Sequence, residues 1–96
     1  MTRHAIGERL RAVRSLRRLT QRQLGRPAGL TKEMVCKIEC GDRELSFAEA
    51  GCFAQVLCIS LDALYRTGPD GLWDITACLL PFTAPPQEEE DEHGGL

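Results

Sequence analysis

Helix-start signals recur so closely along this sequence that only short helices fit between them. Thr20-Gln21-Arg22-Gln23 and Ser46-Phe47-Ala48-Glu49 both match the capping box, in which the first side chain caps the helix and the fourth returns a hydrogen bond. Thr31 and Ser60 are two further N-cap candidates. These signals predict a succession of short helices joined by short loops.

Apolar residues repeat at helical spacing between these caps and predict five helices in residues 1–68. The first helix covers 5–18, the third covers 32–40, and the others begin at the remaining caps. The residues expected to face the core are Ile6, Leu10, Val13, Leu16, Leu24, Ala28, Leu30, Val35, Ile38, Phe47, Ala50, Phe53, Ala54, Leu57, Leu61, Leu64 and Tyr65. Aromatic residues make up only 5% of the chain, which favours packed helices over a β-sandwich. The predicted fold class is all-α, a five-helix bundle with a C-terminal extension.

The second helix contains two residues that disfavour helical structure. Gly25 costs about 1 kcal/mol relative to Ala, and Pro27 lacks the backbone N–H that a helix interior needs. We expect Gly29 to end this helix in the left-handed conformation, or the helix to end a turn earlier.

The chain is predicted to divide into one domain over 1–68 and two C-terminal segments. The turn cluster Gly68-Pro69-Asp70-Gly71 ends the domain. Residues 69–86 are apolar and then proline-rich, and 72–80 are expected to form one more helix or a strand. Residues 87–96 are acidic and are expected to be disordered.

Charge is segregated along the chain although the net charge is only −2. Residues 1–66 hold all 12 basic residues and 7 acidic ones, for a net charge of +5. Residues 67–96 hold no basic residue and 7 acidic ones, for −7. A basic domain with an acidic appendage is typical of a nucleic-acid-binding protein whose tail repels or competes with the nucleic acid. A solubilising tail explains the same pattern.

Catalytic, metal and membrane functions have little support in the sequence. It has no glycine-rich phosphate loop, and its two histidines lie near the two ends, so we assign no catalytic residue, cofactor or metal site. The five cysteines are an odd number without a signal peptide, so we expect reduced thiols, mostly buried, in a cytoplasmic protein. Cys36 is the candidate for redox sensing. No apolar run approaches the roughly 18 residues of a membrane span.

The unit from Thr20 to Glu39 has the order of a helix-turn-helix, a capped short helix, a glycine-containing turn and a second capped helix. Over residues 6–68 the chain resembles the Cro/repressor-type, or xenobiotic-response-element, helix-turn-helix family. The residues that carry this resemblance are Leu10-Arg11, Arg14, Thr20-Gln21, Leu24, Gly29-Leu30-Thr31, Ile38-Glu39, Gly41, Ala54, Leu57, Ser60-Leu61-Asp62 and Leu64.

The resemblance implies a lambda-repressor-like five-helix bundle and a transcription regulator, commonly a homodimeric repressor on double-stranded DNA. Its reading helix would be 31–40, placed in the major groove. The DNA-binding residues it indicates are Gln21, Arg22, Thr31, Lys32, Glu33, Cys36, Lys37 and Arg43. Arg14 and Glu39 match a structural salt bridge of the family and are left out of that set. Side-chain chemistry independently supports a DNA-binding role for three members of the set. Lys32 and Lys37 can donate to guanine or phosphate, and Glu33 can accept from cytosine.

A second interpretation keeps the fold but changes its use. The chain would then be a protein-interaction or antitoxin-like module that binds its partner through 72–82, because an exposed apolar stretch usually needs a partner. The two interpretations are compatible, with DNA bound by 1–66 and a partner by 67–82.

Overall fold

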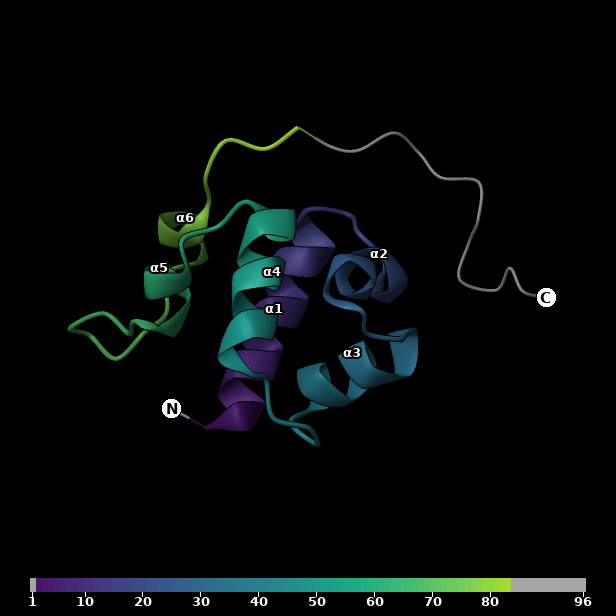
Figure 1. Cartoon of the computed structure of the whole chain (residues 1–96). Helices are drawn as coiled ribbons and strands as arrows, with labels where there is room; N and C mark the ends of the chain where they lie inside the picture. The colour runs from purple at the N-terminus through teal and green to yellow at the C-terminus, as the bar shows by residue number, and fades with distance from the viewer. Residues whose placement is uncertain (1, 84–96) are drawn as a thin grey trace.

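The computed structural model describes residues 2–83 of the chain (Figure 1). These residues form six α-helices and one short 3-10 helix. The elements are α1 (Arg3–Leu16), α2 (Gln21–Gly25), the 3-10 helix η1 (Arg26–Ala28), α3 (Lys32–Cys40), α4 (Phe47–Leu57), α5 (Leu61–Tyr65) and α6 (Ile75–Cys78). The all-α fold is confirmed, since 2–83 contain no β-strand and only one isolated antiparallel bridge, Ile59 with Leu79. Helices α1 to α5 correspond to the five predicted helices, and α6 lies in the extension.

The predicted N-caps start their helices as expected, because each side chain accepts a hydrogen bond from the backbone N–H three residues later. These bonds measure 3.0 to 3.2 Å and belong to Thr20, Thr31, Ser46 and Ser60. The first helix starts earlier than residue 5, at Arg3, because Thr2 accepts from the N–H of Ala5 at 3.0 Å. Local side-chain chemistry therefore determines where these helices begin.

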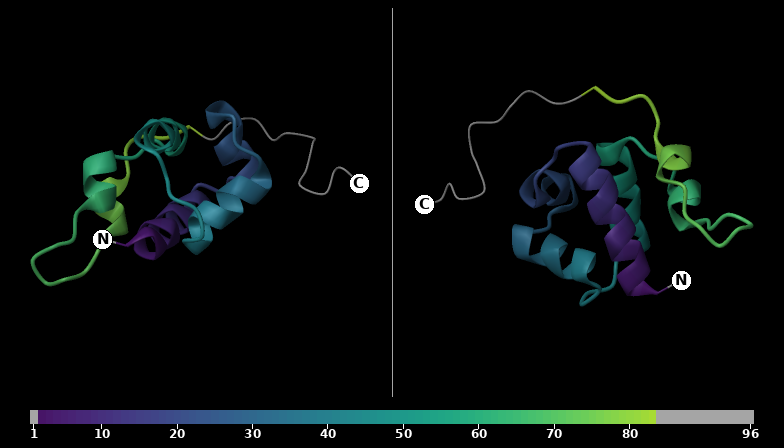
Figure 2. Two further views of the ribbon diagram at one scale, coloured as in Figure 1. Left: turned by 60° about the horizontal axis from the view of Figure 1, so that its bottom comes forward. Right: turned by 180° about the vertical axis from the view of Figure 1, so that it is seen from behind.

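The core lies where α1 packs on α3, α2 and η1 pack on α4, and α5 packs on α1 (Figure 2). Its completely or almost completely buried side chains are Leu10, Val13, Leu24, Val35, Ile38, Phe53, Leu57, Leu64 and Cys78. Gly7 permits the close approach of α1 to α3, since a Cβ there would lie 2.4 Å from the carbonyl oxygen of Ile38. The core is thus aliphatic apart from one phenylalanine and one cysteine.

Three residues expected in the core are exposed instead. Leu16 is 52% exposed because it is the last residue of α1, and Leu19 takes its place in the core after the turn at Arg18. Phe47 is 88% exposed, since it is the first residue of α4 and precedes the turn that reaches the core at Ala50. Tyr65, at the end of α5, is 41% exposed. All three stand at helix ends, where helical periodicity no longer determines burial.

The segment that follows α5 folds back on the bundle. Its Cys78 is fully buried in the core, and its backbone pairs with the α4–α5 connection through Leu80 N to Cys58 O at 3.0 Å and Ser60 N to Cys78 O at 2.9 Å. Residues 72–80, expected as a helix or a strand, form the short α6 followed by the isolated bridge. The acidic segment 87–96 lies outside the described residues.

Candidate nucleic-acid interface

The helix-turn-helix unit is built by α2, η1 and α3. After α2 the chain tightens into η1, with Pro27 at its start, and Gly29 adopts a left-handed φ of 74° before Thr31 caps α3. The early end expected for α2 is therefore observed, and the proline is accommodated where no N–H is needed. Gly25 has a packing role, because a Cβ at this position would lie 2.6 Å from Cγ2 of Val35 on α3.

A buried carboxylate holds α3 against the two helices before it. Glu39 is 5% exposed and accepts from Arg14 through Nε to Oε2 at 2.6 Å and through Nη2 to Oε1 at 3.2 Å. Gln21 donates its amide N–H to Oε1 of the same carboxylate at 3.0 Å. Arg14 also donates to the carbonyl of Leu19 at 2.8 Å. The salt bridge implied for Arg14 and Glu39 is confirmed, and Gln21 joins it.

The outer side of α3 carries the residues expected to meet DNA. Val35 and Ile38 face the core, whereas Glu33, Cys36 and Lys37 are exposed. Lys32 is half-buried and Thr31 is exposed, with its hydroxyl oxygen occupied by the cap to Met34 N at 3.2 Å.

Seven of the eight predicted residues are distributed over three hollows. Four of them, Arg22, Thr31, Lys32 and Glu33, line one open hollow of about 470 Å³ at the start of α3. Gln21 and Cys36 line a second hollow of about 450 Å³ between α1, the start of α2 and α3. Arg43 lines a third on another side of α3, and Lys37 lines none of these.

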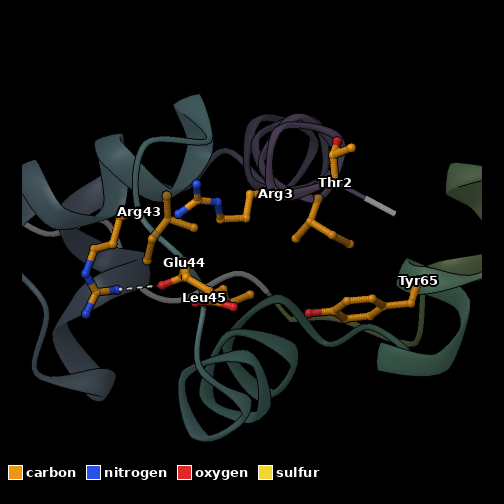
Figure 3. A pocket seen from close by; sticks show the side chains of 8 residues that line it. Thr2, Arg3, Arg43, Glu44, Leu45 and Tyr65 are labelled. Carbon is orange, nitrogen blue, oxygen red and sulfur yellow. Dashed lines mark hydrogen bonds between the residues drawn. The ribbon is translucent and has the colours of Figure 1, made fainter.

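Arg43 is engaged in an ion pair at the start of α4. Its guanidinium donates from Nη1 and Nη2 to the two carboxylate oxygens of Glu49, each at 3.0 Å. These bonds lower the pKa of Glu49 to about 2, and they raise the pKa of Arg43. Figure 3 shows Arg43 at the edge of a pocket of about 160 Å³, where it also donates to the carbonyl of Glu44, with Tyr65 on the opposite side.

Comparison with known proteins identifies the fold. No protein-family model matches the chain, and a search of the curated proteins found no match. Among solved structures, the chain is similar to the restriction-modification controller protein C.AhdI from Aeromonas hydrophila, with 30% sequence identity and a TM-score of 0.62. The match covers 66% of this chain and 96% of that chain. This chain has the controller-protein fold.

The cysteines depart from the expectation that most of them are buried. In this controller-protein fold only Cys78 is buried, Cys52 and Cys58 are intermediate, and Cys36 and Cys40 are exposed. The last two lie four residues apart on α3, on the side that borders the hollow beside α1. The pKa of the Cys40 thiol is raised, mainly because of a side-chain hydrogen bond with Cys36.

Arg9 on α1 and Arg17 at its C-terminal cap turn toward the C-terminal segment and not toward the exposed side of α3. Arg9 donates to the carbonyl of Leu64 at 2.8 Å, and its guanidinium lies 5.1 Å from the centroid of the Trp73 ring. Arg17 lies 4.3 Å from the centroid of the Phe82 ring. Arginine-rich composition does not reveal this division, because it depends on which side of α1 the later segment covers.

Two further arginines lie beside the predicted site, although neither is among the eight DNA-binding residues predicted from the sequence. Arg11 and Arg18 line the same hollow as Gln21 and Cys36. Arg11 lies on α1, whereas Arg18 lies beyond the end of that helix with a left-handed φ of 62°, so helical spacing does not predict that the two are neighbours.

Neither a membrane-spanning helix nor a metal-ligand cluster occurs in residues 2–83. None of the helices there is long and apolar enough to span a membrane. The same residues contain no group of three or more histidine, cysteine or acidic side chains that could hold a metal ion.

Proposed function

We propose that this protein is a sequence-specific double-stranded-DNA-binding transcription regulator that reads the major groove with residues 31–40. The observation that carries the proposal is the capped α2–α3 pair, locked through Glu39, with Lys37 and Glu33 exposed on the outer side of α3. The likeness to a controller protein of a restriction-modification system supports it.

Base reading is assigned to the long polar side chains of α3. Lys32 and Lys37 would donate to guanine O6 and N7 or to phosphate, and Glu33 would accept from cytosine N4. The exposed Cys36 lies between these side chains on the helix and would contact the groove. The Thr31 hydroxyl accepts the cap hydrogen bond and retains its own O–H for a phosphate.

Contacts with the phosphate backbone of the DNA are assigned to three residues outside residues 31–40. Gln21 has a second amide N–H besides the one that it donates to Glu39, and Arg22 lines the hollow at the start of α3. Arg43 keeps N–H donors for phosphate while it is paired with Glu49, because a guanidinium has five.

We further propose a homodimer that binds a two-fold-related operator in the cytoplasm and represses transcription by occupying it. Two recognition helices of a dimer would then enter successive major grooves on one side of the DNA. The acidic segment 87–96 would either compete with DNA for the basic domain or keep the protein soluble.

Selection of bound duplexes from a random library by the purified full-length protein tests this function. A two-fold-symmetric motif is the expected result. Lys37→Gln should then weaken binding by about tenfold, as expected for loss of a base contact. Arg66→Gln is the matched control, because it removes one charge from an exposed residue that pairs with Asp62 on α5.

The alternative function, a protein-interaction or antitoxin-like module, has less exposed apolar surface to support it than the sequence suggested. Trp73, Ile75, Leu79 and Cys78 of the 72–82 segment pack on the chain's own core, while Leu72 is 67% exposed. A folded sample that enriches no duplex would overturn DNA reading and leave a partner bound on 72–82 as the function to test.

A further inference from the structure

Two exposed thiols and three guanidinium groups line one hollow of this fold. The hollow of about 450 Å³ is bounded by Arg11, Arg14 and Arg18 on one side and by Cys36 and Cys40 on the other. Arg14 is engaged in the buried ion pair described above. For Arg11 and Arg18, the structure shows no carboxylate partner within residues 2–83. The hollow therefore presents positive charge next to nucleophilic sulfur.

The spacing of the two cysteines prevents them from reacting with each other. Residues four apart on an α-helix have Cβ atoms about 5–6 Å apart, whereas a disulfide needs a Cβ separation near 3.8 Å. An intact α3 therefore does not close a Cys36–Cys40 disulfide. Cys40 holds its proton more strongly than an ordinary thiol because of its hydrogen bond with Cys36, which leaves Cys36 as the nucleophile of the pair.

We propose that Cys36 is a modification site for small anionic disulfides, whose carboxylates are bound by Arg11 and Arg18. The Cys36 thiolate attacks one sulfur of the incoming disulfide and forms a new sulfur–sulfur bond. The original sulfur–sulfur bond breaks, and the leaving thiolate departs with its electron pair. Cys36 is oxidised and the departing half is reduced, so the incoming disulfide supplies the only oxidant required.

Charge and geometry together explain why the adduct would persist. Concentrated positive charge raises the local concentration of an anion and speeds its association. Because Cys40 lies one helical turn away, it cannot resolve the mixed disulfide into an internal one. The adduct therefore remains until another thiol removes it.

The consequence for DNA rests on the proposed function. An anionic adduct on Cys36 would place negative charge on the side of α3 that carries Lys37, which would repel phosphate. The modification itself does not depend on that function, so the two are tested separately.

The experiment compares two disulfides of opposite charge on the full-length protein. Oxidised glutathione is the anionic probe and cystamine the cationic one, and peptide mass spectrometry follows the rate at each cysteine at low salt. We expect Cys36 to react about tenfold faster with the anionic probe. Cys52, half-buried on α4, is the internal reference and should show no such preference.

Charge variants identify the cause of the preference. Arg11→Gln with Arg18→Gln should abolish it, whereas Arg11→Lys with Arg18→Lys should keep it. Both residues are exposed, so the fold should be retained. Arg66→Gln removes one positive charge directly after α5, a helix that lies away from α3 (Figure 1), and should leave the preference unchanged.

Three results would overturn the site. They are equal rates for the two probes at Cys36, a preference that survives the double glutamine variant, and an internal Cys36–Cys40 disulfide as the product. Cys40→Ser should leave the adduct yield unchanged, and a higher yield would show that Cys40 resolves it. An adduct that forms as expected but leaves duplex affinity unchanged would contradict only the link to the proposed function.

Discussion

Arg14 on α1 donates to both carboxylate oxygens of Glu39 on α3, at 2.6 and 3.2 Å, where the Glu39 side chain is only 3% exposed. Gln21, the first residue of α2, donates to the same carboxylate at 3.0 Å. One buried acid therefore sets the positions of all three helices that present the candidate interface.

Replacing this acid should cost stability. Glu39→Gln leaves the guanidinium of Arg14 largely buried without its counter-charge, and we expect a loss of about 3 kcal/mol in the free energy of unfolding. Urea denaturation measures the loss. Glu8→Gln is the control, because Glu8 pairs with His4 at a side-chain exposure of 68% and should change stability by less than about 0.5 kcal/mol. Equal effects of the two substitutions would contradict this role of Glu39.

The Arg43–Glu49 pair should make stability depend on pH in the acid range. The pKa of Glu49 is lowered from 4.5 to about 2 in the folded chain, mainly by its hydrogen bonds with Arg43. The stabilisation is therefore fully present above pH 4.5 and is lost as the pH falls toward 2. Solvent screening at the partly exposed Arg43 reduces this stabilisation.

Glu49→Gln isolates this contribution. Glutamine retains the capping-box hydrogen bond to Ser46 N but removes the charge that pairs with Arg43. Unfolding free energies from pH 6 to pH 2 should therefore fall less steeply in the variant than in the wild type. Parallel curves would show that the pair contributes nothing measurable.

Two glycines in helices should respond to alanine in opposite directions. Gly25→Ala should destabilise the fold by about 2 kcal/mol, because its Cβ would lie 2.6 Å from Val35 and 2.8 Å from the carbonyl oxygen of Leu30. Gly51→Ala should stabilise it by about 0.5–1 kcal/mol, since nothing lies within 4 Å of the added carbon in α4. Thermal denaturation of each variant beside the wild type measures the two changes in stability. A stabilising Gly25→Ala would refute the close approach of α2 to α3.

Arg17 should determine how firmly the C-terminal segment is held. Its guanidinium donates to the carbonyls of Leu57, Cys58 and Leu80 at 2.8, 3.0 and 2.9 Å. Arg17→Lys keeps the charge but loses this planar set of donors. We expect faster hydrogen exchange at the Leu80 amide, which donates to Cys58 at 3.0 Å.

The matched control for that experiment is Arg18→Lys, which alters the exposed neighbouring arginine. It should leave exchange at Leu80 unchanged. Equal hydrogen-exchange rates at the Leu80 amide in the wild type and in Arg17→Lys would show that Arg17 does not hold the C-terminal segment.

The sequence by itself determined where the helices begin. Thr20, Thr31, Ser46 and Ser60 cap helices through bonds to residues three positions away, and such local chemistry can be read without knowing the rest of the fold. The salt bridge of Arg14 with Glu39 and the exposure of Lys37 were likewise expected.

Tertiary structure decided what depends on distant segments. Whether an arginine of α1 faces the hollow beside α3, as Arg11 does, or stacks on Phe82, as Arg17 does, depends on where residues 72–83 return to the bundle. Phe47 fits a buried helical pattern yet is 88% exposed, because no element within residues 2–83 covers its side chain at the first turn of α4. Periodicity states which residues share a helix side, but only packing between distant segments determines what covers that side.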